Sequence, residues 1–121
     1  MKEFVDALVR SGVLKTQVII EAFSRVDRKD FVPQDFQEYA YGDYPLPIAF
    51  EQTISQPTTV AFMLELLQPQ QGEKILDIGS GSGWTTALLA FLVGKGGKVF
   101  GVERIPELVA FGNENIKKYN F

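Results

Sequence analysis

Apolar residues recur three and four positions apart near the N-terminus, which is the spacing of one face of a helix. The pattern runs over 4–9 and again over 18–26, so we expect two short helices that pack on a core rather than anchor a membrane. Ser11-Gly12 ends the first helix, Thr16 is placed to cap the second, and Pro33 stops any continuation.

Residues 31–50 follow no regular period and concentrate aromatic side chains. So many aromatics are rare in a disordered linker, and we expect an ordered loop that wraps over a surface. The aromatic residues are Phe31, Phe36, Tyr39, Tyr41, Tyr44 and Phe50, with Pro45 and Pro47 between the last two.

A buried helix is expected from about residue 56 to residue 67. Pro57 suits the first helical turn, where its missing N–H costs nothing, and Ser55 or Gln56 is placed to cap it. Residues 60–67 are apolar almost all round, which is typical of a helix enclosed by other elements.

Two short apolar segments, 74–78 and 98–102, each lead into a helical pattern, over 84–93 and 106–119 respectively. Apolar strands that alternate with helices predict a right-handed βαβ unit whose strands are parallel and of the buried type.

The expected organisation is a single domain of the α/β class over 1–121. Its lead-in, 1–55, holds the first helices and the aromatic loop, and its core, 56–121, is an αβαβα unit that binds a ligand. In open parallel sheets the ligand lies at the carboxyl ends of the strands, so attention falls on the turn after the first strand.

That turn reads Gly79-Ser80-Gly81-Ser82-Gly83, which taken alone has the composition of a flexible linker. It joins an apolar strand directly to an apolar helix with no spare residues, which indicates a ligand-binding bend instead. The phosphate-loop pattern is absent, and the third glycine comes one position too early for the dinucleotide fingerprint. The observed pattern is Asp-x-Gly-x-Gly-x-Gly, beginning at Asp77.

Glu103 closes the second strand, twenty residues beyond Gly83. At this separation a carboxylate meets the two ribose hydroxyls of an adenosine, so turn and acid together predict a nucleoside-bearing cofactor. Two plainer readings stay open. Glu103 would be a solvated charge at a strand end, and Asp77 would bond to the N–H groups of the turn itself.

Composition limits the chemistry that the chain can perform. It has no His and no Cys, which excludes zinc sites with those ligands, cysteine nucleophiles and Ser-His-Asp triads, and we expect no metal. Twelve Lys and Arg against fifteen Asp and Glu give a net charge of −3, which argues against nucleic acid as a partner. The longest apolar run, 87–93, is too short to span a bilayer, so we expect a cytoplasmic protein without a membrane partner.

With these residues in view, the chain resembles the protein-L-isoaspartate O-methyltransferases, which depend on S-adenosyl-L-methionine. The glycine turn occurs across many methyltransferases, whereas the "TISQP" segment after an aromatic loop is particular to this family. Four stretches carry the resemblance in the family's order: "RVDRKDFVP" (25–33), "YGDYPLPIAFEQTISQP" (41–57), "EKILDIGSGSGWTTALLA" (73–90) and "KVFGVERIPEL" (98–108).

The resemblance implies a Rossmann-like methyltransferase fold and transfer of a methyl group to the free carboxylate of L-isoaspartyl, and also D-aspartyl, residues in damaged proteins. A carboxylate is already ionised at neutral pH, so a chain without His needs no general base for this reaction. The implied active-site residue is Ser55, which orients by hydrogen bonding. The implied cofactor-binding residues are Thr53, Ile54, Asp77, Gly79, Ser80, Gly81, Gly83 and Glu103.

The resemblance covers the front half of the family's pattern, without the later strands, a second acidic loop beside the adenine, or the region that closes the acceptor pocket. Thr58 also stands where the family commonly has His or Tyr after "SQP". Because two parallel strands make a poor sheet, we expect these 121 residues alone to bind cofactor weakly and to transfer little methyl. A dimer that completes the sheet remains an alternative.

Two other functions stay open at this point. A shortened methyltransferase fold can serve as a non-catalytic binding or interaction module, and methyl transfer to RNA or to a small molecule would use the same cofactor half. Only the 41–57 stretch speaks against the second of these.

Overall fold

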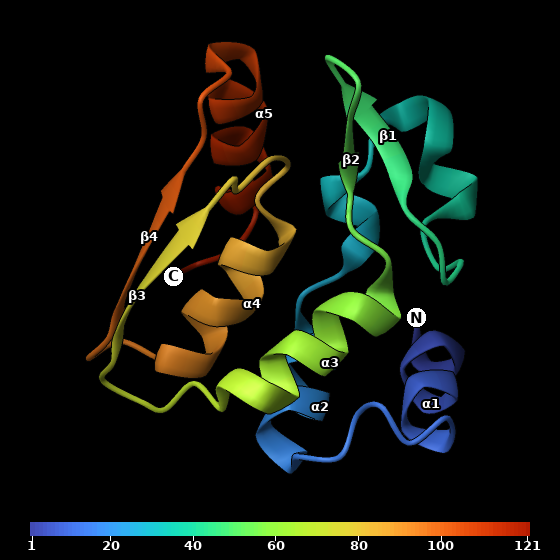
Figure 1. Cartoon of the computed structure of the whole chain (residues 1–121), viewed down its shortest axis with the longest axis vertical. Helices are drawn as coiled ribbons and strands as arrows, with labels where there is room; N and C mark the ends of the chain where they lie inside the picture. The colour runs from blue at the N-terminus through green and yellow to red at the C-terminus, as the bar shows by residue number, and fades with distance from the viewer.

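The periodic segments form the helices and strands that their spacing predicts, and the computed structural model describes all of residues 1–121 (Figure 1). Residues between these elements form two 3-10 helices and a hairpin. In chain order the elements are α1 (Lys2–Arg10), α2 (Gln17–Arg25), η1 (Arg28–Phe31), η2 (Gln34–Tyr39), β1 (Leu46–Ala49), β2 (Gln52–Ile54), α3 (Pro57–Leu67), β3 (Lys74–Ile78), α4 (Trp84–Val93), β4 (Lys98–Val102) and α5 (Pro106–Ile116).

The strands β3 and β4 pair in parallel, in a register that places Lys74 beside Lys98 and Ile78 beside Val102. Helix α4 connects them and is buried almost all round, as its apolar sequence predicts. The predicted βαβ unit and α/β fold class are therefore confirmed. Helix α5 ends at Ile116, three residues before the expected end, and Tyr119 beyond it stacks on Phe31.

The stretch 31–50 contains more regular structure than the sequence predicts. The strands β1 and β2 form an antiparallel hairpin whose two-residue turn, Phe50-Glu51, has φ angles of 51° and 58°. Hairpin turns of this kind favour Asn or Gly because other side chains are strained at positive φ. The register also shifts between Pro47 and Ala49, so Ile48 is an extra residue that forms a bulge.

Thr16 occupies the N-cap position of α2, as expected, but its side chain forms no capping hydrogen bond. Its hydroxyl donates instead to Glu65 Oε2 at 2.6 Å. Glu65 Oε1 accepts from the N–H groups of Lys15 and Thr16 at 2.7 and 2.8 Å. One carboxylate on α3 therefore holds the start of α2, at a sequence distance that local capping rules do not cover.

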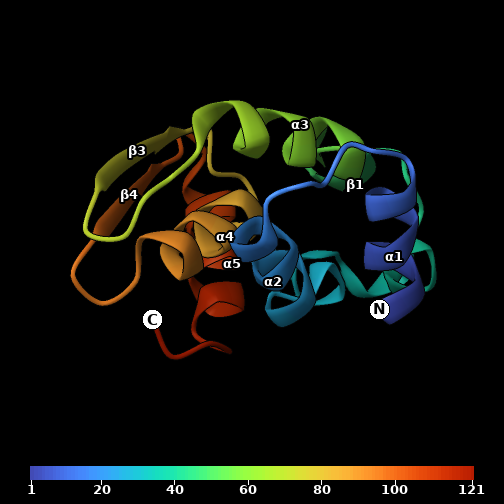
Figure 2. The same ribbon diagram turned by 90° about the horizontal axis from the view of Figure 1, so that it is seen from below.

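A single cluster of 23 buried apolar residues joins the front helices, the hairpin, α3 and α4. Figure 2 shows β3 and β4 at the rim of the molecule, with α4 and α5 on one side of them. On the other side Leu76 and Ile78 are 58% and 77% exposed, and Phe100 and Val102 are exposed as well. The expectation that both strands are buried is therefore wrong for one face of the sheet, because no element of this chain covers it.

None of the five α-helices combines the length and the apolar character needed to cross a lipid bilayer.

A buried leucine and an exposed leucine should differ in how much the same substitution changes the free energy of unfolding. Leu88 in α4 is completely buried, so Leu88→Ala should lower the free energy of unfolding by roughly 2–5 kcal/mol or prevent folding. Leu66 in α3 is 70% exposed, so Leu66→Ala should change it by less than about 0.5 kcal/mol. Urea denaturation followed by circular dichroism measures both, and equal losses would contradict the described core.

Candidate functional site

The turn after β3 is a bend of nearly bare main chain attached to the end of β4. The N–H groups of Gly79 and Ser80 both donate to the carbonyl oxygen of Val102, at 2.8 and 3.0 Å. Gly79 has a φ of 79°, and a Cβ placed on it would meet no atom within 4 Å. A left-handed backbone with open space beside it leaves room for a ligand to approach the main chain.

Gly83 has a different neighbour from the other glycines of the turn. It also has a positive φ, 91°, but a Cβ there would lie 3.2 Å from the carbonyl oxygen of Gly112 in α5. Gly112 in turn approaches Gly81, whose carbonyl oxygen lies 3.0 Å from the position of a Gly112 Cβ. These glycines therefore allow α5 to lie directly against the turn.

Glu103 directs its carboxylate at the glycine turn. Its Oε1 accepts the N–H of Gly81 and its Oε2 accepts the N–H of Ile105, both at 3.0 Å. The reading of Glu103 as a solvated strand-end charge is therefore wrong. Each carboxylate oxygen has a second lone pair that no protein donor uses, so the group is fixed in place and can still accept hydrogen bonds.

Asp77 lies beneath the turn and accepts the hydroxyl of Thr86 at 2.6 Å. None of the N–H groups of the turn donates to its side chain, so that alternative for Asp77 is wrong. Burial raises the pKa of Asp77, while the hydrogen bond from Thr86 acts in the opposite direction. No cation pairs with this carboxylate within the chain, and its charge is uncompensated at neutral pH.

Thr53, Ile54 and Ser55 run from β2 toward the start of α3. Ser55 is exposed, and its hydroxyl makes no hydrogen bond within the protein, whereas Ile54 is buried in the core. Gln56 occupies the N-cap position of α3, as expected, but neither its side chain nor that of Ser55 makes a capping hydrogen bond. Asp43 fulfils that role by accepting from the N–H and the hydroxyl of Thr58, at 2.9 and 2.6 Å.

Two adjoining hollows gather these residues at the carboxyl end of β3. The first, of about 510 Å³, is lined by Thr53, Gly79, Gly81 and Glu103 among others. The second, of about 700 Å³, shares the first three of these and adds Ile54, Ser55, Asp77 and Ser80. All the site residues that the sequence predicts therefore line one hollow or the other, except Gly83.

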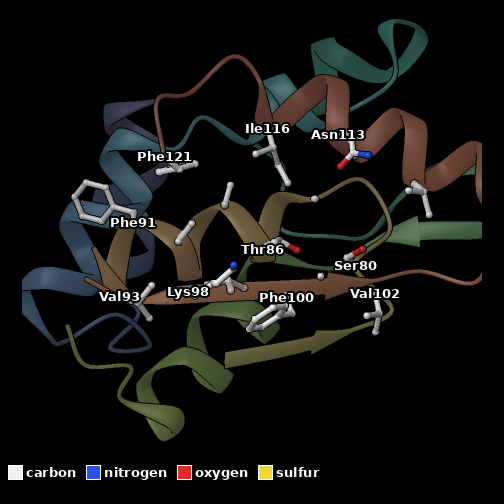
Figure 3. A pocket seen from close by; sticks show the side chains of 18 of the residues that line it. Ser80, Thr86, Phe91, Val93, Lys98, Phe100, Val102, Asn113, Ile116 and Phe121 are labelled. Carbon is white, nitrogen blue, oxygen red and sulfur yellow. The ribbon is translucent and has the colours of Figure 1, made fainter. Parts of the chain in front are cut away.

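A third hollow, of about 940 Å³, lies elsewhere, between β4, α4 and α5 (Figure 3). Phe91, Ile116 and Phe121 line it together with the polar residues Thr86 and Asn113. No Asp or Glu side chain lines it, so the acidic groups that the sequence singles out lie at the other two hollows.

Some residues of the site escaped the sequence analysis. The bulge in β1 places Ile48 Cδ1 3.3 Å from the position of a Gly81 Cβ, and Ile48, Arg104 and Ile105 line the smaller hollow. The sequence offers a signal for Arg104 and Ile105, because they come directly after Glu103. Nothing in the sequence of 46–49 signals the bulge.

Comparison with known proteins identifies the family. Residues 1–121 match the model of the protein-L-isoaspartate(D-aspartate) O-methyltransferases along their whole length. The chain belongs to this family. It is 51% identical over 117 residues to a protein-L-isoaspartate O-methyltransferase of Aeropyrum pernix, covering 97% of this chain and 45% of that protein. A relative from Methanopyrus kandleri is 45% identical, with coverage of 99% and 53%.

Solved structures of isoaspartate methyltransferases confirm the predicted fold. A Plasmodium falciparum protein described as a member of the family, in complex with S-adenosyl-L-homocysteine, superposes with a TM-score of 0.87 at 32% identity. The match covers 97% of this chain and 55% of that one. A second protein-L-isoaspartate O-methyltransferase gives 0.84 at 27% identity, covering 97% and 38%. The chain thus spans about half the length of the relatives it matches.

The residues around the two hollows combine bare main chain, free hydrogen-bond acceptors and an uncompensated negative charge. Gly79 offers open space beside its main chain, and its carbonyl oxygen accepts no hydrogen bond from the protein. Glu103 offers free lone pairs to hydroxyl donors, and the uncompensated carboxylate of Asp77 favours an ammonium group nearby. A hollow of about 510 Å³ lies within the size range of small-molecule sites.

The unpaired charge of Asp77 predicts a pH-dependent effect of its removal. Because the folded pKa of Asp77 is raised, the folded chain holds the proton more tightly than the unfolded chain does. This group's contribution to stability therefore falls as pH rises through the window between the ordinary pKa of 3.8 and the higher folded value. Asp77→Asn keeps an oxygen for Thr86 and should gain stability relative to the unsubstituted chain across that window. Urea denaturation at a series of acid to neutral pH values tests this, and a difference independent of pH would contradict it.

Proposed function

We propose that this chain forms the cofactor-binding part of an S-adenosyl-L-methionine-dependent carboxyl methyltransferase that acts on L-isoaspartyl and D-aspartyl residues of damaged proteins. One observation carries the proposal: the carboxylate of Glu103 is held by the N–H of Gly81, within hollows that Gly79 and Ser55 also line. Family membership and the relative's complex with S-adenosyl-L-homocysteine support the same cofactor class.

Four groups of this chain are assigned to hold the cofactor. Glu103 accepts the ribose hydroxyls through its unused lone pairs, and the carbonyl of Gly79 accepts from the ammonium group of the amino-acid part. The charge of Asp77 stabilises that ammonium, and the Gly79–Gly81 bend provides the close approach. Thr53, Ile54 and Ser80 complete the walls. When bound, the cofactor supplies the methyl group as part of a sulfonium.

Ser55 is assigned to the acceptor. Its exposed hydroxyl has no partner within the protein and is therefore available to donate to a carboxylate oxygen. An ionised carboxylate needs no base to remove a proton, so the contribution of Ser55 is orientation. Holding reactants in line supplies roughly 7–11 kcal/mol of a barrier in favourable cases.

The binding assignment predicts a specific loss on changing Glu103. Glu103→Gln replaces one acceptor oxygen by an N–H donor that faces a backbone N–H, so S-adenosyl-L-homocysteine should bind roughly 10-fold more weakly or worse. The matched control is Glu107→Gln, since Glu107 is exposed on the first turn of α5 and lines neither hollow. Isothermal titration at millimolar ligand measures both. Equal affinities of the two variants, or no saturable binding by the unsubstituted chain, would count against the site.

A non-catalytic module is the second candidate, and the exposed face of the sheet favours it. Leu76 and Ile78 present apolar surface of the kind that a partner covers. Transfer of labelled methyl from S-adenosyl-L-methionine to an isoaspartyl peptide, but not to its aspartyl twin, supports the enzyme. Because these 121 residues alone are expected to transfer little methyl, the module is supported by saturable binding of a partner to the Leu76–Ile78 face together with no transfer to either peptide.

A further inference from the structure

Arg28 is a fully buried cation that contacts the main chain of loop 40–44 and of Ser55. Its Nη1 donates to the carbonyl oxygens of Ala40 and Gly42, at 2.7 and 3.2 Å. Its Nη2 donates to those of Tyr44 and Ser55, at 3.0 and 3.1 Å. One guanidinium therefore binds both loop 40–44 and Ser55, which are separate in the sequence.

No carboxylate lies within ion-pairing distance of this group, so the carbonyl dipoles hold the charge. Burial lowers the pKa of Arg28 to about 10, which leaves it protonated at neutral pH. The guanidinium also lies 5.3 Å from the ring centroid of Trp84, the first residue of α4 after the glycine turn. Burying a cation that has no counter-ion costs desolvation free energy, which hydrogen bonds to the cation offset.

We propose that Arg28 is a positioning residue for Ser55. By binding the Ser55 carbonyl and loop 40–44 together, it fixes the main chain at the end of β2 and keeps the Ser55 hydroxyl at the hollow before any ligand arrives. The functional consequence rests on the proposed function, in which Ser55 orients the acceptor. The mechanical claim, that the Arg28 side chain joins these two segments, does not rest on the proposed function.

The geometry requires a guanidinium and not simply a positive charge. A guanidinium is a rigid planar fork with five donors, and Arg28 uses both terminal nitrogens, two carbonyls on each. A lysine ammonium has three donors on one atom and cannot reach four carbonyls. Nearer the surface, loop 40–44 and the start of α3 are joined a second time, because the side chain of Gln56 donates to the carbonyl oxygen of Asp43 at 3.1 Å. Arg28 supplies the inner connection.

Amide hydrogen exchange of the ligand-free chain tests the mechanical claim. In Arg28→Lys, exchange in peptides covering 40–44 and 53–58 should become roughly 10-fold faster or more, while α4 keeps its protection. Arg25→Lys is the matched control, because Arg25 is exposed and its only partner is Glu21, 3.9 Å away, and it should exchange as the unsubstituted chain does. Unchanged exchange, faster exchange throughout, or failure to fold would each overturn the proposal, since none singles out these two segments.

Chemical rescue separates positioning from simple filling of space. In Arg28→Ala, methylguanidinium should restore slow exchange in 40–44 and 53–58, whereas methylammonium at the same concentration should not. Equal effects of the two cations, or none from either, would contradict the need for the planar fork. Neither measurement involves the cofactor or its analogue. A failure of S-adenosyl-L-homocysteine to bind would therefore overturn the proposed function while leaving the role of Arg28 intact.

Discussion

The hydrogen bond from the Gly81 N–H to the Glu103 carboxylate is the contact on which the site depends. It joins two strand ends that are adjacent only because β3 and β4 pair in parallel, with Val102 accepting from Gly79 and Ser80 beside it. The parallel pairing requires α4 as a crossover, and α4 is held by the front helices and by α3 through the shared core. The acid at the end of one strand and the bare bend at the end of the other thus form a single binding edge, as open parallel sheets generally provide.

Sequence reasoning succeeded where a feature is repeated along the chain and failed where it depends on a distant partner. The helices, the parallel strands and the pairing of the glycine turn with Glu103 follow from spacing alone. The hairpin was missed because its turn is Phe50-Glu51, residues that do not signal a left-handed turn. Arg28 was missed because its partners are carbonyls, which every residue has. The missing side-chain cap at Thr16 has a similar origin, since its hydroxyl donates to Glu65, far along the chain.

The two faces of the β3–β4 pair differ in how far they are exposed to solvent. One face packs on α4, and the other leaves Leu76 and Ile78 mostly in water. The chain spans about half the length of the curated relatives that it matches. The exposed apolar surface of β3 is of the kind that further polypeptide or a partner covers. The residues proposed to hold the cofactor and the acceptor nevertheless lie together within these 121 residues, since Ser55, Asp77 and Glu103 all line the two hollows.

The close approach of Gly112 to Gly81, and of Gly83 to Gly112, has a mechanical consequence. Helix α5 leaves the turn no clearance at Gly83, where an added Cβ would lie 3.2 Å from the carbonyl oxygen of Gly112. At Gly81 an added Cβ would lie 3.3 Å from Ile48, which belongs to the buried core. The turn is therefore confined by two separate elements, and a larger side chain at either glycine would have to displace one of them.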